Sequence, residues 1–300
     1  MKFLTWQKLW FSLSIFLICL AIASLVSWGL RVGIDFSGGQ LLEAQFADQT
    51  DINQVREILD DANSQEIIPN YSISKTDSDS FLVRISANEE ELSSLRTSLN
   101  EVGEWQEIRF ENVGPTVGKD LTRKAVIGVV MASIAIILYI SWAFRQVPPP
   151  TNSWQFGITA IIALIHDLII TIGAFSALGH FLGYEVDSLF ITALLTVLGF
   201  SVHDTIVTYD RIRENLLLNQ GKLDFAEIVN NSVSQTIVRS INTSLTLILV
   251  LLSLVLLGGS SIRPFISALL VGVTIGTYSS IFIAAQLLIL WQSKSKKAIK

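Results

Sequence analysis

Six apolar segments are spread along the chain, and each is long enough to cross a membrane as a helix, which takes about 20 apolar residues. They lie at 9–30, 125–144, 156–178, 188–209, 240–257 and 265–291. Only 16% of the residues are charged, against about 25% in a typical soluble domain. The sequence therefore predicts a polytopic α-helical membrane protein with six transmembrane helices, and it excludes most classes of soluble enzyme.

The first apolar segment has two interpretations. The basic residues Lys2 and Lys8 precede it, and residues 21–23 read Ala-Ile-Ala, which has the form of a signal-peptide cleavage site. The apolar part of a signal peptide is usually about 7–15 residues long, however, and this run is longer. We expect an uncleaved transmembrane helix, with a cleaved signal peptide as the alternative.

Basic residues are concentrated in the segments that six spans place on the same side as the termini. Eleven Lys and Arg residues fall there: Lys2, Lys8, Arg145, Arg211, Arg213, Lys222, Arg239, Lys294, Lys296, Lys297 and Lys300. The short loops on the opposite side contain only Arg263. Because cytoplasmic loops carry the excess of Lys and Arg, we expect cytoplasmic termini and an extracytoplasmic segment between the first two spans.

That segment, residues 31–121, is acidic. It contains 18 Asp and Glu against 7 Lys and Arg, a net charge of −11, whereas the rest of the chain has a net charge of +6. The composition is typical of a soluble domain inserted into a membrane protein. No basic face of the kind that nucleic-acid binding requires is visible, so no nucleic-acid partner is expected.

The acidic segment reads as two similar halves, each with strands and a helix. Helical spacing follows Asp51 and Asn88, two residues suited to cap a helix N-terminus. Alternating apolar residues indicate strands at 39–47, 67–74, 81–85 and 105–113. The resulting order, β-α-β-β-α-β, is that of the ferredoxin-like split βαβ arrangement.

The expected domain organisation follows from these segments. It comprises an N-terminal tail with the first span at 1–31, an extracytoplasmic α+β ferredoxin-like domain at 32–122, a bundle of five spans at 123–293 and a basic cytoplasmic tail at 294–300. The fold of the outer domain does not by itself define a function. Because it contains no nucleophile–base pair and no metal cluster, we interpret it as a docking or gating domain.

The sequence offers no support for catalysis or cofactor binding. Cys19 is its only cysteine, which excludes a disulfide framework and CxxC motifs, and its three histidines form no HExxH motif. Residues 114–119 do not form a Walker A loop. We expect no metal, no cofactor and no enzymatic activity.

Ionisable residues inside the predicted spans carry functional hypotheses, because each costs at least about 2.5 kcal/mol on insertion scales. Asp167 lies in the middle of the third span, beside His166. Since neighbours at i and i+1 point to different helix faces, we expect the two side chains to have separate partners. Asp167 has two interpretations, a structural hydrogen bond to a neighbouring helix and a functional proton-binding group.

Asp204 is the second such residue. It lies sixteen residues after Ser188, about 24 Å along a helix, with His203 beside it and Thr208 one turn further on the same face. A carboxylate in apolar surroundings keeps its charge only with a partner or water, and otherwise takes up a proton. A group that switches so easily suits a proton relay.

Arg239 precedes the fifth span and is followed by polar residues that include Ser240, Asn242 and Thr243. This helix start is too polar to face lipid, and it indicates hydrogen bonding between helices or a wet cavity. Arginine does not deprotonate in proteins, so Arg239 would act as a fixed counter-charge for a nearby aspartate. The alternative is an interfacial arginine that snorkels towards water.

Two further patterns have structural interpretations. Gly272 and Gly276 form a G-x-x-x-G pair in the sixth span, which predicts close helix packing. A charged cluster at the cytoplasmic boundary of the fourth span is interpreted as interfacial; it consists of Asp210, Arg211, Arg213 and Glu214.

Six blocks of the sequence resemble the SecF family, whose members act with SecD in bacterial Sec export and are relatives of the RND transporters. The blocks are GIDFSGG at 33–39, VGPTVGKDL at 113–121, ALIHD at 163–167, LLTVLGFSVHDTIVTYDRIREN at 194–215, RSINTSL at 239–245 and GTYSSIF at 276–282. Family motif positions among them are Gly33, Asp35, Gly38, Gly39, Asp210, Arg211, Arg213, Glu214 and Asn215. His203 stands where the family more often has Asn, which would modify the titration of Asp204.

The resemblance implies a function. It implies an accessory subunit in the bacterial inner membrane that associates with SecD and the SecYEG channel. With the proton motive force, this subunit would help complete the export of unfolded preproteins that the SecA ATPase has pushed. The resemblance also implies that Asp204 and Arg239 move protons. Candidates for relay or support are Asp167, His166, His203, Thr208, Asn242 and Thr243, and membrane lipid is a further partner.

Two other functions remain open on the sequence. Kinship with RND transporters allows one half of an exporter of small molecules or lipids, although the outer domain is small for a substrate funnel. A non-transporting assembly scaffold of the translocon, with Asp204 and Arg239 as a static pair, is the other. Charge-neutral replacement of Asp204 distinguishes the scaffold from the proton-driven subunit.

Overall fold

The structure is a computed structural model that describes residues 6–47, 50–68, 71–76, 80–85, 89–219 and 222–298. The chain divides into two compact units. A helical unit takes its residues from Met1–Leu30, Ile127–Tyr184 and Leu189–Lys300, and a small unit consists of Arg31–Val126 together with Glu185–Ser188. The short segment Glu185–Ser188 therefore joins the small unit from a distant part of the sequence.

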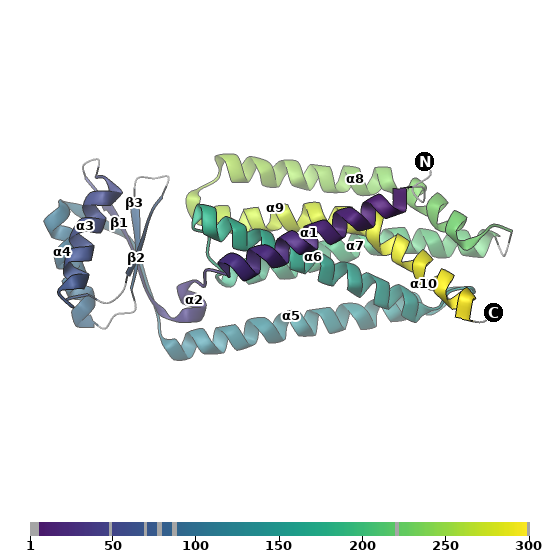
Figure 1. Cartoon of the computed structure of the whole chain (residues 1–300), viewed down its shortest axis with the longest axis horizontal. Coiled ribbons are helices and arrows are strands. Elements are labelled where there is room, and N and C mark those ends of the chain that lie inside the picture. Colours follow the sequence, from purple (N-terminus) through teal and green to yellow (C-terminus); the bar gives the residue numbers. More distant parts are fainter. Residues whose placement is uncertain are drawn as a thin grey trace. The chain divides into compact units, whose positions relative to one another are not determined.

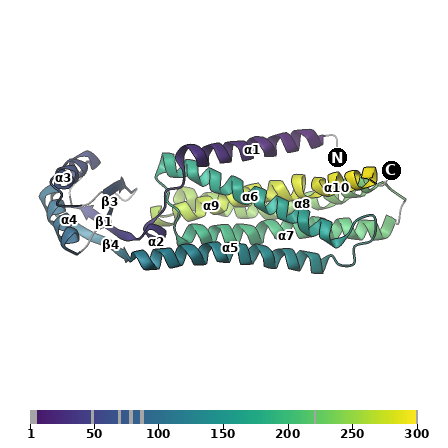
Figure 2. The ribbon, with the colours of Figure 1, turned by 60° about the horizontal axis from the view of Figure 1, so that its bottom comes forward.

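The described residues contain six helical segments that are long and apolar enough to cross a membrane, as the sequence predicts. They are α1 (Gln7–Trp28), α5 (Pro115–Ala143), α6 (Ser153–Leu182), α7 (Ser188–Asn219), α8 (Phe225–Leu257) and a last segment, Ser260–Ser293. At least half of the most apolar part of α6, α7 and the last segment is buried, against at most 17% in α1, α5 and α8. Helices α6 and α7 and the last segment therefore form the interior of the helical unit. Helix α1 runs alongside α6 (Figures 1 and 2).

Several helices are longer than their apolar segments predict. Helix α5 begins at Pro115 rather than near residue 125, and α8 begins at Phe225 rather than near residue 240. The difference arises because hydropathy marks only the part of a helix that suits lipid, whereas backbone hydrogen bonding continues into polar turns. The first turns of α8 bury Ile228 and Val229 against the helical core.

The last segment is not one regular helix, which the sequence does not predict. It consists of a short 3₁₀ turn (Ser260–Ile262), α9 (Arg263–Ser279), the π-helix η3 (Ser280–Ala284) and α10 (Ala285–Ala298). The fully buried Tyr209 of α7 donates from its hydroxyl to the carbonyl oxygen of Ala284 at 3.2 Å. A helix α7 side chain thus holds the C-terminal end of the π turn, a type of turn that often lies at functional sites.

The small unit is built on a four-stranded antiparallel sheet in the order β2-β3-β1-β4. Its elements are β1 (Gly39–Phe46), α3 (Ile52–Ser64), β2 (Tyr71–Lys75), β3 (Ser80–Ile85), α4 (Glu89–Val102) and β4 (Trp105–Val113). They follow the expected order β-α-β-β-α-β. In the central pair, Leu42 lies opposite Val83, and both side chains are buried in one core with Leu59 of α3 and Leu95 of α4.

The helix cap and the strand start predicted for the small unit are confirmed only in part. Asp51 caps α3, because its side chain accepts a hydrogen bond from the Asn53 backbone N–H at 3.4 Å. The second strand starts at Tyr71, later than the predicted residue 67, and the predicted cap Asn88 lies outside the described residues. The sequence does not predict the short helix α2 (Ile34–Ser37) that precedes β1.

Candidate functional site

Asp204 lies in the buried interior of α7, and its carboxylate has a single hydrogen-bond partner among the described residues. The Oγ of Ser244, on α8, donates to Asp204 Oδ2 at 3.3 Å. Asp204 is 3% exposed, and within the described structure it forms no salt bridge with Arg239. The site is therefore a buried carboxylate with weak local support.

Two further hydroxyl groups on the same two helices are buried without a hydrogen-bond partner in the described part of the chain. Thr208 is one helical turn beyond Asp204 on α7, and Ser240 is one turn before Ser244 on α8. A buried polar group that lacks a partner costs about 1–3 kcal/mol. Hydroxyl groups left in this state around an ionisable side chain offer donor and acceptor positions to a mobile proton or water.

The remaining polar residues predicted near Asp204 lie on exposed surfaces of α7 and α8. The set comprises His203, Arg239, Asn242 and Thr243. Thr208 and Ser240 thus lie one helical turn from Asp204 and from Ser244 along their own helices, while Arg239 is exposed on the isolated chain. Polar side chains that are exposed on a membrane-spanning helix are unfavourable where they face lipid.

Asp167 of α6 has far more support than Asp204. Its Oδ2 accepts hydrogen bonds from Ser201 of α7 at 2.6 Å and from Ser279 of α9 at 2.7 Å. Its Oδ1 lies 2.9 Å from Nδ1 of His166, so the expectation that these sequence neighbours have entirely separate partners is wrong. The side chains are long enough to meet beside the helix although their Cα–Cβ bonds diverge.

The hydrogen bonds around Asp167 continue to α1. Nε2 of His166 lies 3.1 Å from Oγ of Ser14, and Ser14 lies 3.1 Å from the Tyr278 hydroxyl. That hydroxyl also donates to the carbonyl oxygen of Trp10 at 2.7 Å. We call these side chains the Asp167 network: Ser14, His166, Asp167, Ser201, Tyr278 and Ser279. It connects four helices, and within the described structure no hydrogen bond joins it to Asp204.

The predicted glycine pair of α9 positions this network. A Cβ atom on Gly272 would lie 2.3 Å from a methyl of Val197, and one on Gly276 would lie 3.0 Å from Cβ of Ser201. The absence of side chains at these glycines lets α9 approach α7 closely. Ser279 and Ser201 can then reach the same carboxylate oxygen.

The charged cluster near the end of α7 connects that helix to α8. Arg211 pairs with Glu214 at 2.5 Å and donates from Nε to Gln235 at 2.5 Å. Asn215 donates to Ser232 at 2.8 Å and to Gln235 at 2.9 Å. Arg213 and Asp210 form a further ion pair, at 2.9 Å, whose side chains are partly exposed. Arg211 and Asn215 thus hold α7 against α8, whereas the two ion pairs lie within α7 itself.

The four motif residues at positions 33–39 lie in the small unit. Asp35 accepts a hydrogen bond from the backbone N–H of Ser188 at 2.9 Å. Gly38 has φ of +75°, a conformation that favours glycine, and Gly39 follows as the first residue of β1. Gly33 donates its N–H to the carbonyl oxygen of Val186 at 2.9 Å. This motif thus belongs to the small unit, whereas Asp204 belongs to the helical unit.

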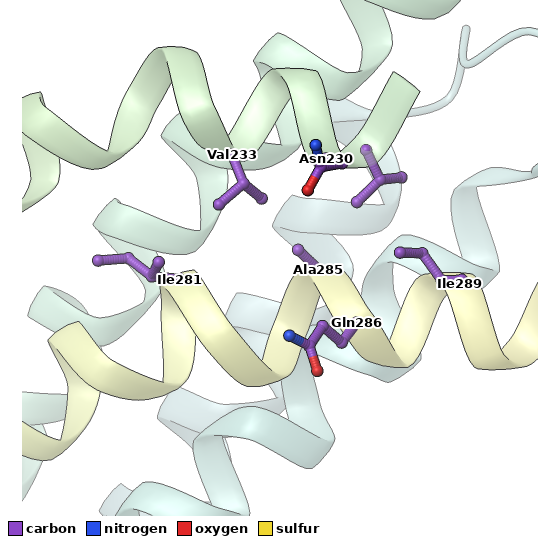
Figure 3. Close-up of a pocket in the computed structure, with 7 residues that line it drawn as sticks. Asn230, Val233, Ile281, Ala285, Gln286 and Ile289 are labelled. Atoms are coloured by element: carbon purple, nitrogen blue, oxygen red, sulfur yellow. The ribbon is translucent and has the colours of Figure 1, made fainter. Parts of the chain in front are cut away.

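A shallow pocket lies between α8 and the η3–α10 region, and neither aspartate lines it. Figure 3 shows side chains from the two helical segments facing each other across it. Its lining is mostly apolar: Val229, Asn230, Val233, Ile281, Ala285, Gln286 and Ile289. Within the described residues, no three His, Cys, Asp or Glu side chains are grouped so as to hold a metal ion.

Most of the hydroxyl groups that bond the two aspartates are not predicted from the sequence. Ser201, Ser244 and Ser279 supply the direct bonds, and Ser14 and Tyr278 extend them. The available signal was weak, because a single serine in an apolar helix is common. Its proximity to a carboxylate depends on how distant helices pack.

Comparisons with known proteins agree with one another. The family model described as protein export membrane protein SecD/SecF, C-terminal, matches residues 94–294. Protein translocase subunit SecF of Thermobaculum terrenum is 42% identical, covering 96% of this chain and 93% of that protein. The SecF of Anaerolinea thermophila is 41% identical, with coverage of 96% and 92%.

A solved structure has the same fold. It is the crystal structure of SecDF, a translocon-associated membrane protein from Thermus thermophilus, with 33% identity and a TM-score of 0.84. The similarity covers 98% of this chain but 39% of that chain, so this protein spans well under half the length of SecDF. With the matches in sequence and structure taken together, the chain belongs to the SecF family of protein translocase subunits.

Proposed function

We propose that this subunit acts with a SecD partner to couple the proton motive force to late stages of preprotein export. In this proposal it works beside the SecYEG channel after SecA has pushed the unfolded preprotein. It spans the bacterial inner membrane with cytoplasmic termini, and its ferredoxin-like domain lies outside the cytoplasm. Asp204 takes up and releases the proton, and Arg239 supplies the fixed positive charge.

The observation that carries this proposal is the contrast between the two buried aspartates. Asp167 has three hydrogen-bonding side chains on its carboxylate, whereas Asp204 has the one bond from Ser244. Burial without strong partners disfavours the charged form of a carboxylate, so such a group takes up a proton more easily than a well-bonded one. Asp204 is thus suited to carry a proton, and Asp167 is suited to hold helices together.

The energy scale of the membrane potential fits this role. Movement of one elementary charge through 100 mV is worth about 2.3 kcal/mol. That exceeds the thermal energy several-fold, so it can bias an equilibrium between two conformations. An energy of this size, delivered by a proton that binds at Asp204, is enough to change the populations of two conformations of the protein.

The exposed polar surface supports the SecD partner. Arg239, Asn242 and Thr243 are exposed on α8, and His203 is exposed on α7. Because such residues are unfavourable against lipid, a second bundle of helices is the expected neighbour. The SecDF chain that resembles this one is more than twice as long. We expect the second bundle to correspond to the part of SecDF that this chain does not match.

The test compares export of a Sec-dependent reporter into membrane vesicles with and without an imposed proton gradient. Wild type, Asp204→Asn and the matched control Asp120→Asn are compared at equal abundance, and Asp120 is an exposed residue of α5. We expect Asp204→Asn to lose the gradient-dependent part of export while it still co-purifies with SecD and SecYEG.

The other functions give different results in the same experiment. Unchanged gradient-dependent export in Asp204→Asn contradicts the proton-coupling role and favours an assembly scaffold. Failure of the wild-type chain to co-purify with SecYEG favours a half-exporter of small molecules or lipids.

A further inference from the structure

We infer that Asp35, Arg84 and Glu185 are positioning residues that fix the first turn of α7, the helix that carries Asp204, to the small unit. The inference rests on the proposed function, because it gives the route by which events at Asp204 reach the outer domain. It also assigns a role to the GIDFSGG motif, whose contribution the sequence leaves open.

The first contact is a cap on α7 that comes from a distant part of the chain. The carboxylate of Asp35 accepts hydrogen bonds from both the backbone N–H and the hydroxyl of Ser188, which is the first residue of α7. The first N–H groups of a helix lack partners within the helix, and a negative charge is favourable at this end. Asp35 therefore satisfies both requirements at once.

The second contact is a short backbone pairing just before α7. Gly33 donates its N–H to the Val186 carbonyl oxygen at 2.9 Å, and Val186 donates its N–H to the Arg31 carbonyl oxygen at 2.8 Å. A Cβ on Gly33 would lie 3.1 Å from that Val186 oxygen. The close approach therefore requires a residue without a side chain at position 33.

The third contact is an ion pair between the sheet and the segment that leads into α7. Arg84, on β3, pairs with Glu185, and their side chains are only 22% and 18% exposed. Burial lowers the pKa of Arg84 and raises the pKa of Glu185, although each charge favours ionisation of the other. The charged groups Arg31 and Asp187 also face this pair.

These pKa directions indicate what the pair contributes. The cost of removing both charges from water exceeds the gain from their attraction, so the pair is a poor source of stability. A buried ion pair of this kind is better suited to select one arrangement of the elements that it joins. Here it selects the position of Glu185 against β3.

The three contacts converge on four consecutive residues, Glu185–Ser188, which belong to the small unit. From Ser188, α7 continues without interruption to Asp204, about 24 Å further along the helix axis. A continuous helix transmits displacement along its axis. A shift of α7 when Asp204 gains or loses its proton therefore acts on residues that are held by the sheet and by Asp35.

The experiment uses the export assay with full-length protein in complex with its partners. Arg84→Gln and Glu185→Gln each break the ion pair, and the double exchange Arg84→Glu with Glu185→Arg restores it with reversed polarity. Arg96→Gln, which breaks the more exposed Arg96–Glu107 pair of the same unit, is the matched control. Thermal unfolding and co-purification with SecD verify that each variant is folded and assembled.

We expect the two single variants to lower the gradient-dependent part of export by about fivefold or more, a typical allosteric coupling. The gradient-independent part of export should stay near wild type, and the double exchange should recover at least half of the loss. Arg96→Gln should have no effect. Such recovery separates positioning from a general weakening of the fold.

Three results would overturn the inference. In the first, the single variants keep full gradient-dependent export while Asp204→Asn loses it, and the proposed function then stands without this joint. In the second, both parts of export fall together and the double exchange recovers nothing, which indicates a structural role only. In the third, Asp204→Asn also keeps full export, which removes the proposed function itself.

Discussion

The Oγ of Ser244 on α8 lies 3.3 Å from Oδ2 of Asp204 on α7 and 2.8 Å from the carbonyl oxygen of Ser240. A hydroxyl has one proton, so Ser244 donates to only one of these acceptors at a time. A protonated Asp204 can instead donate to Ser244 while Ser244 donates to Ser240. With Asp204 neutral, Asp204 and Ser244 each donate one hydrogen bond. With Asp204 charged, either its carboxylate or the Ser240 carbonyl oxygen lacks the bond from the Ser244 hydroxyl.

This relationship makes Ser244 the residue that adjusts to the proton on Asp204. We predict that Ser244→Ala slows gradient-dependent export by about two- to tenfold, since a typical hydrogen bond contributes about 0.5–1.5 kcal/mol. Thr246→Ala removes an exposed hydroxyl from the same helix and should leave the rate unchanged. The measurement is the initial rate of reporter export under an imposed gradient, and equal rates for Ser244→Ala and wild type contradict the prediction.

The Asp167 network predicts a different outcome for the other aspartate. Asp167→Ala leaves His166, Ser201 and Ser279 without their shared acceptor in a buried site. We expect a loss of about 3–5 kcal/mol in the free energy of unfolding, seen as a lower midpoint of thermal unfolding in detergent. Asp204→Ala removes one long bond and should lower the midpoint much less. A smaller loss for Asp167→Ala than for Asp204→Ala would show that the two roles are reversed.

The close contact of α9 with α7 gives a prediction about packing. A methyl group at Gly272 would overlap the Val197 side chain, whereas a Cβ on Gly199 of α7 would meet no atom within 4 Å. Gly272→Ala should therefore destabilise the protein by about 1–3 kcal/mol. Gly199→Ala should be neutral or stabilising, because alanine is the better helix former. Thermal unfolding of the two variants checks the difference, which vanishes if α9 can move away at no cost.

The parts of this fold that the sequence predicts are those that depend on local pattern. Apolar length reveals the six spans, and alternation reveals most of the strands, because each property is present within one segment. Asp167 and Asp204 are recognisable for the same reason, since a charged residue in an apolar segment needs an explanation.

The parts that the sequence does not predict depend on residues far apart in the chain. Asp35 and Ser188 are separated by 153 positions, and nothing near either one indicates their hydrogen bond. Similarly, Ser279 donates to Asp167 from 112 positions away. The π turn at Ser280–Ala284 has no local signature, and Tyr209 holds its last carbonyl from another helix.

The buried ion pair of the small unit predicts a pH dependence of stability. Burial raises the pKa of Glu185 above the ordinary value of about 4.3. Between the ordinary and the raised pKa, the folded chain keeps a proton on Glu185 that the unfolded chain has released. The contribution of Glu185 to the free energy of unfolding therefore falls as pH rises through this window.

Glu185→Gln carries the uncharged form at every pH, so it should not show this fall. We expect its midpoint of thermal unfolding to match that of wild type near pH 4 and to exceed it at neutral pH. Glu107→Gln, in a more exposed pair with Arg96, is the control and should follow the wild-type profile. If Glu185→Gln is less stable than wild type at neutral pH, the ion pair stabilises the fold by itself. Greater stability combined with weaker gradient-dependent export would mean that the pair is retained for position rather than for stability.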